Sequence, residues 1–134
     1  MILNQTAEYA LRAATELAAV WPDGRLPSRD LAVRANVPAS YLSKVMRKMV
    51  VAGLVQSERG HHGGFRLTRA PGAISFGDVL AAIEFAPGRN VCAFGLGQCN
   101  PKAPCALHDA WTRLGDSFDH WARTTHLDGQ VRED

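Results

Sequence analysis

The sequence lacks any apolar stretch that approaches the roughly 20 residues needed to cross a membrane. Hydrophobic residues make up 46% and charged residues 21% of its 134 residues, which is ordinary for a globular protein. The amino-terminal residues 1–6 also lack the basic-then-apolar layout of a secretory signal peptide. We therefore expect a cytoplasmic protein without a membrane partner, built as one compact domain with room for an appended element.

Cysteine is scarce, and its distribution is informative. The chain has 3 cysteines, all between Cys92 and Cys105. An odd number in a cytoplasmic context argues against a framework of structural disulfides, whereas clustering favours metal or redox chemistry. The sequence contains no motif for a nucleophile beside a base and no phosphate-cradling loop, so we do not expect an enzyme.

Acidic residues are rare in one segment of an otherwise balanced chain. Residues 25–69 hold nine Lys or Arg and only two acids, Asp30 and Glu58, which gives a local balance of +7. The remaining residues have a balance of −5, and the net charge of the chain is +2. A basic segment of this kind indicates contact with a polyanion, although a solvated basic face is the alternative.

The basic segment contains two predicted short helices separated by a tight turn. Ser28 is suited to cap the first helix, which runs to about Ala35, and Asn36 suits the left-handed position that follows. The second helix runs from residue 39 or 40 to 52 and has one apolar face. A further helix over 6–20, with Thr6 as its expected cap, precedes them. This order predicts a helix-turn-helix.

A predicted hairpin follows directly. Residues 54–59 and 65–69 resemble two short strands, and the glycine-rich segment 60–64 joins them. Such a hairpin after a helix-turn-helix is the wing of a winged helix. The expected fold is therefore mainly α with a small β-hairpin wing, and its expected partner is double-stranded DNA. The candidate DNA contacts are Ser28, Ser40, Tyr41, Ser43, Lys44, Arg47, Lys48, Arg59, His61, His62 and Arg66.

The carboxyl-terminal third divides into a short helix over 76–84, a loop and a long helix. Residues 105–125 place apolar side chains at spacings of 4, 3, 4 and 3, which is the seam pattern of a helix that packs along another. We interpret this seam as a dimer interface, against the alternative of a helix that packs on its own domain. Its members are Leu107, Trp111, Leu114, Phe118 and Trp121.

The predicted organisation is a winged helix-turn-helix domain over 1–84, a cysteine-containing loop over 85–104, a dimerisation helix over 105–126 and a polar tail over 127–134. We expect nothing to order the tail.

The spacing Cys92-x6-Cys99-x5-Cys105 matches neither zinc ribbons nor bacterial ferredoxins. Three thiolates in one loop suit an iron–sulfur cluster that takes a fourth ligand from elsewhere. Cys105 lies at the expected start of the long helix, where the helix dipole favours a thiolate, and His108 follows one turn later. A thiol–disulfide switch, a zinc site and three inert thiols are the alternatives.

Several motifs, taken in order, resemble the IscR/NsrR-type family of bacterial winged-helix regulators nearly end to end. They are Glu8-Tyr9-Ala10-Leu11-Arg12-Ala13, Val37-Pro38-Ala39-Ser40-Tyr41-Leu42, Gly60-x-x-Gly63-Gly64-Phe65-x-Leu67, Ile74-Ser75-x-x-Asp78-Val79 and Cys105-x-x-His108-x-x-Trp111. The resemblance implies a homodimer held by the long helix, a dyad-symmetric operator, and a 2Fe–2S or 4Fe–4S cluster that tunes DNA affinity in response to redox state, nitric oxide or iron supply.

The same resemblance implies the cluster ligands. Cys92, Cys99 and Cys105 match the family's three cysteines, with one residue more than usual between the first two. His108 matches the fourth ligand of the cluster-biogenesis branch. Glu8 matches the position where the nitric-oxide-sensing branch has an aspartate from the other subunit. We favour Glu8 for a 4Fe–4S cluster and His108 for a 2Fe–2S cluster.

Three hypotheses follow from the sequence: a cluster-controlled repressor or activator, a metal-free regulator with a cysteine switch, and an iron–sulfur carrier or thiol redox enzyme. The third leaves the basic winged helix unexplained.

Overall fold

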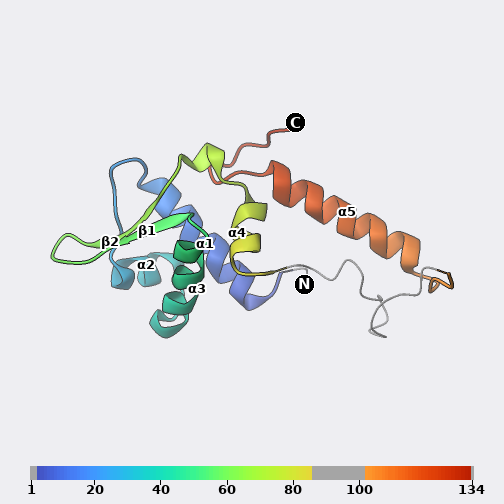
Figure 1. Cartoon of the computed structure of the whole chain (residues 1–134), viewed down its shortest axis with the longest axis horizontal. Coiled ribbons are helices and arrows are strands. Elements are labelled where there is room, and N and C mark those ends of the chain that lie inside the picture. The colour runs from blue at the N-terminus through green and yellow to red at the C-terminus, as the bar shows by residue number, and fades with distance from the viewer. Residues whose placement is uncertain (1–2, 86–101, 134) are drawn as a thin grey trace.

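The computed structural model describes residues 3–85 and 102–133. Its elements are α1 (Gln5–Ala19), α2 (Ser28–Ala35), α3 (Ala39–Val51), β1 (Val55–Glu58), β2 (Gly64–Leu67), the 3-10 turn η1 (Pro71–Ala73), α4 (Phe76–Ala82) and α5 (His108–Thr124). The wing, α2 and α3 gather at one end of the molecule, and α5 projects from the other (Figure 1). This is the predicted mainly α fold with a hairpin wing. Within the described ranges, no helix is long and apolar enough to span a bilayer.

The winged helix is organised around α1, whose small residues allow its neighbours to approach closely. Ala7, Ala10, Ala13 and Ala14 are fully buried, and α1 contacts α2, α3, α4 and β2. The predicted apolar face of α3 is also buried, as are the predicted inward residues of α4. These residues are Leu42, Val45, Met46 and Met49 on α3, and Val79, Leu80 and Ile83 on or just after α4.

The wing is an antiparallel pair in which Val55 lies opposite Leu67 and Glu58 lies opposite Gly64. A short extended segment before α2 adds to its edge, because Leu26 and Phe65 exchange two backbone hydrogen bonds of 3.0 and 2.9 Å. The wing is therefore joined to the residues that lead directly into α2.

Two predicted helix caps were wrong. Asn4, not Thr6, caps α1, with its Oδ1 accepting from the Ala7 N–H at 2.8 Å. The Thr6 hydroxyl lies 3.1 Å from the Tyr41 hydroxyl on α3 instead. Ser28 is the first residue of α2, and Pro27 occupies the cap position without a side-chain hydrogen bond. Asn36 does adopt the predicted left-handed conformation, with φ of 55°.

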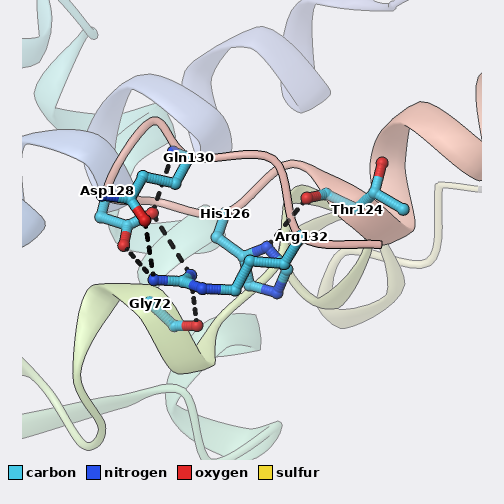
Figure 2. Close-up of polar contacts among 6 residues, drawn as sticks. All are labelled: Gly72, Thr124, His126, Asp128, Gln130 and Arg132. Carbon is cyan, nitrogen blue, oxygen red and sulfur yellow. Dashed lines mark hydrogen bonds and ion pairs between the residues drawn. The ribbon is translucent and has the colours of Figure 1, made fainter. Parts of the chain in front are cut away.

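The carboxyl-terminal residues are ordered, contrary to the expectation of a free polar tail. Leu127 is buried in the core, and residues 125–127 pair with residues 74–76. Arg132 hydrogen-bonds to Asp128 (Figure 2). That bond, with a second from the Gln130 backbone N–H, holds the pKa of the Asp128 carboxyl below its ordinary value.

Candidate functional site

The predicted recognition helix α3 presents most of its candidate DNA contacts to solvent. Five of them are exposed: Ser40, Ser43, Lys44, Arg47 and Lys48. Tyr41 differs, because its ring packs edge-on against Tyr9 at 5.2 Å between centroids and its hydroxyl faces Thr6. Its side chain therefore ties α3 to α1, and its contact with DNA stays a prediction.

Most of the positive charge on this end of the molecule is not neutralised by the residues that the structure describes. Of the nine basic residues in 25–69, Arg25 pairs with Glu58 and Arg34 pairs with Glu16, both at 3.1 Å. The other seven make no ion pair with any residue in the described ranges, namely Arg29, Lys44, Arg47, Lys48, Arg59, Arg66 and Arg69. Uncompensated cations on a recognition helix and a wing are suited to DNA phosphates and guanine edges.

The amino-terminal ends of α2 and α3 have a second property that suits DNA. Pro27 and Pro38 occupy the two cap positions, and neither makes a side-chain capping bond within the described structure. The Tyr41 N–H donates to the Pro38 carbonyl at 3.0 Å, but the first two N–H groups of each helix make no hydrogen bond in the described structure, and the helix dipole favours an anion there. The predicted contact Ser28 is exposed at the start of α2.

The wing is held by contacts that the sequence did not reveal. Arg25 Nη1 lies 3.1 Å from the Glu58 carboxylate and donates to the His62 carbonyl at 3.3 Å. Arg59, His61 and His62 are exposed at the tip. Arg66 is half-buried, and its Nε has no hydrogen-bond partner in the part of the chain that the structure describes.

Gly64 allows the wing to pack against the segment before α2. Its φ is +147°, and a Cβ there would lie 2.7 Å from the backbone of Leu26. We predict that Gly64→Ala destabilises the protein by about 2 kcal/mol more than Gly60→Ala, because the two Leu26–Phe65 hydrogen bonds, each worth about 1 kcal/mol, must break. Gly60 is a matched control, since it is in the same hairpin with a φ of +103° and a Cβ there would meet nothing within 4 Å. Urea unfolding measures the difference, and equal losses for both variants would contradict the prediction.

Cys105 and His108 lie together at the amino-terminal end of α5. The helix begins at His108, three residues later than expected, so Cys105 precedes it and the predicted effect of the helix dipole on its thiol loses its basis. The His108 N–H donates to the Cys105 carbonyl at 3.1 Å, which places both residues in one turn. Both side chains are half-buried. Cys92 and Cys99 lie outside the described residues.

Glu8, the other candidate ligand, is already engaged in the protomer. Its carboxylate lies 3.6 Å from Arg12 Nη2. Arg12 also donates to the Asn36 carbonyl at 3.0 Å and covers the Tyr9 ring at 5.3 Å. One guanidinium therefore connects Glu8 with the turn of the helix-turn-helix. Among the described residues, no three ligand-type side chains converge as a metal site, but these residues include only one of the three cysteines.

The predicted seam of α5 is largely exposed on the protomer. Leu107, Trp111, Leu114 and Trp121 expose 45%, 38%, 46% and 36% of their surface. Phe118 is buried against Phe85 and Trp121. Leu114 and Trp121, with Leu3, Ser117 and Phe118, line an apolar groove of about 330 Å³. One edge of the seam thus packs on its own domain, and the rest presents an apolar stripe to solvent.

The chain is similar to known transcriptional regulators. IscR of Vibrio campbellii is 30% identical and IscR of Vibrio vulnificus is 33% identical, both over 134 residues that cover all of this chain and 79% of the relative. CymR, described as the global cysteine regulator of B. subtilis, superposes with a TM-score of 0.79 at 25% identity, over 96% of this chain and 95% of that one. IscR of T. potens shares the fold with a TM-score of 0.77 at 22% identity, over 96% and 85% of the two chains.

The family model described as an iron-dependent transcriptional regulator matches residues 3–132. The family and the relatives are regulators of transcription and not enzymes, which confirms the prediction that the chain is not a catalyst. The chain belongs to the Rrf2 family of transcriptional regulators.

Proposed function

We propose that the chain is a cytoplasmic, homodimeric DNA-binding regulator whose operator affinity is controlled by an iron–sulfur cluster. The observation that carries the proposal is the composition of α5. The turn that leads into α5 brings Cys105 close to His108, the first residue of the helix, and α5 carries most of the exposed apolar stripe. A change at the ligand end is therefore transmitted directly to the proposed interface.

In this proposal the winged helix binds DNA, whereas α5 and the cysteine loop provide dimerisation and sensing. The winged helix binds DNA through α3, the open ends of α2 and α3, and the wing. Pairing of two α5 helices places two recognition helices on a dyad-symmetric operator, as in other dimeric helix-turn-helix proteins. The domain boundaries proposed from the sequence, 1–84, 85–104 and 105–126, correspond to DNA binding, sensing and dimerisation.

The donor chemistry fits an iron–sulfur cluster. Cys92, Cys99 and Cys105 supply thiolates, the preferred ligands of such clusters. His108 lies three residues after Cys105 in the same turn, and its backbone N–H donates to the Cys105 carbonyl at 3.1 Å. Glu8 has a side chain that is 28% exposed, but it must exchange its contact with Arg12 for the cluster. When bound, the cluster supplies a charge and an oxidation state that respond to redox conditions.

The experiment is an absorbance spectrum with iron and acid-labile sulfide per protomer, on protein purified without oxygen. We expect a brown protein with a band near roughly 400 nm, as for thiolate-bound clusters, and iron that is lost in Cys105→Ala. Retention of the cluster in Glu8→Gln but not in His108→Ala identifies the histidine as fourth ligand, and the reverse pattern identifies the glutamate. His120→Ala, on the same helix away from Cys105, is the matched control.

A colourless protein without iron or sulfide after reconstitution would overturn the cluster and leave a second candidate function, a regulator that uses a thiol–disulfide switch. The three thiols gathered between Cys92 and Cys105 favour this as the alternative. In that case operator affinity should respond to thiol oxidants and recover with dithiothreitol.

A further inference from the structure

The carboxyl-terminal residues 125–132, which we call the C-terminal strap, tie α5 to the segment that leaves the wing. The Thr125 carbonyl accepts from the Phe76 N–H at 2.8 Å, and the Leu127 N–H donates to the Ile74 carbonyl at 3.0 Å. Leu127 then enters the core. The strap therefore runs alongside residues 74–76, which connect η1 to α4.

Arg132 closes the strap. Its backbone N–H donates to the carbonyl of Thr124, the last residue of α5, at 2.8 Å. Its guanidinium donates to the Gly72 carbonyl at 2.8 Å and to the Asp128 carboxylate at 2.6 Å. Figure 2 shows the side chain spanning from the strap to Gly72. One residue thus holds three segments: the end of α5, the turn of the strap, and η1.

Gly72 leaves the room that this arrangement needs. A Cβ at Gly72 would lie 2.7 Å from Arg132 Nη2 and 2.9 Å from Asp128 Oδ2. Because both atoms are the ends of side chains, an alanine would displace the Arg132–Asp128 pair and not the backbone of η1.

Among the elements of the described structure α5 packs mainly on α4, with further contacts from Phe118 to Phe85 and from His120 to Glu133. The helix crosses α4 near its carboxyl-terminal end, where a Cβ on Gly77 would be 3.2 Å from the Ala122 carbonyl and where Phe76 packs on Trp121 at 5.4 Å. Figure 1 shows the rest of α5 projecting beyond α4. The helix is about 25 Å long, so a rotation of about 10° at the crossing moves its amino-terminal end by about 4 Å.

We propose that Arg132, Asp128 and Gly72 form a clamp that fixes the direction of α5 relative to the winged helix, and that Arg132 is a positioning residue for binding to a two-half-site operator. The inference rests on the proposed dimer and goes beyond it. The crossing with α4 anchors one face of α5, and the strap adds a second anchor on the segment that joins the wing to α4. Together they set the separation of the two recognition helices.

The test uses the full chain and two variants. Arg132→Gln removes the guanidinium of the clamp, and Gly72→Ala places a methyl group where the Arg132–Asp128 pair lies. Arg123→Gln is the control, because it makes the same charge change on the exposed surface of α5. Hydrogen exchange is measured at the strap amides. A dyad-symmetric operator is first selected from random duplexes with the unmodified chain. The affinity of each variant is then measured for this operator and for a duplex that contains only one half-site.

We expect both variants to raise exchange at the Leu127 and Arg132 amides at least about tenfold and to weaken full-operator binding about tenfold. Half-site affinity should stay as in the control. Unchanged exchange, or faster exchange with unchanged full-operator affinity, would overturn the clamp. Failure of the proposed function gives a different result. The unmodified chain would then bind neither the full operator nor the half-site, while hydrogen exchange would still report whether the clamp orders the strap.

Discussion

Replacement of Leu114 by glutamate is expected to convert the proposed dimer into monomers and to weaken operator binding by at least about 100-fold. Leu114 exposes 46% of its surface near the middle of α5, where it lines the apolar groove together with Leu3, Phe118 and Trp121. In an isologous interface the substitution occurs twice, so two carboxylates enter one apolar contact. Burial of each unpaired charge costs several kcal/mol, which opposes association directly.

The loss of affinity follows from the loss of the second half-site. A monomer binds one half-site independently of the other, and the gain from linking two binding modules is typically about 100-fold to 10,000-fold. Sedimentation equilibrium measures the assembly, and titration of the full operator and of a half-site measures binding. Half-site affinity should be unchanged.

The matched control for this substitution is again Arg123→Gln. Arg123 lies nine residues after Leu114, about 180° around the helix, and its substitution changes the charge by the same amount. It should remain a dimer with the operator affinity of the unmodified chain. A Leu114→Glu protein that stays dimeric with full affinity would show that the exposed stripe of α5 is not the interface.

Patterns that repeat along one element predicted the structure well. The apolar face of α3 is fully buried as predicted, because burial of one helical face is specified by spacing within 13 residues. The wing follows from two short strands around glycines, and the left-handed Asn36 follows from the chemistry of its own side chain. These features depend on neighbours in the sequence.

Features set by distant partners were missed. Thr6 and Asn4 are both competent caps, but the Thr6 hydroxyl is taken by Tyr41, which lies 35 positions away. The strap has an ordinary polar composition, and it is ordered by distant partners such as Ile74, Phe76 and Gly72, the last of them 60 positions from Arg132. The Arg25 contact with the wing is of the same kind, since Glu58 and His62 come near it only after the hairpin packs against Leu26.

The candidate site was predicted unevenly for the same reason. The exposed cations of α3 follow from its amphipathic pattern, whereas Tyr41 belongs to the same polar list and is turned toward α1 by Tyr9 and Thr6. The cluster ligands were inferred by resemblance, and of the three cysteines only Cys105 lies in the described structure. The sequence placed the start of the long helix at Cys105, directly after Pro104, but the helix begins three residues later, at His108. Pro104 alone could not specify that start.

Replacement of Arg47 by alanine should weaken operator binding about tenfold to a hundredfold. Arg47 lies one turn after Ser43 and Lys44 on the exposed face of α3, and it makes no ion pair with the described residues. Its charge is thus available to DNA, and its loss removes either a contact to a base edge or a contact to a phosphate.

A salt series separates these two roles of Arg47. If it binds a phosphate, affinity falls alike for operator and random DNA, and the slope of log affinity against log salt decreases by about one. If it reads a base, the loss is confined to the operator and the slope is unchanged. Arg34→Ala is the control, because it removes a positive charge from α2 that Glu16 already neutralises at 3.1 Å. Operator affinity that is the same for Arg47→Ala as for Arg34→Ala would show that α3 does not enter the groove with this face, whatever the state of the cysteines.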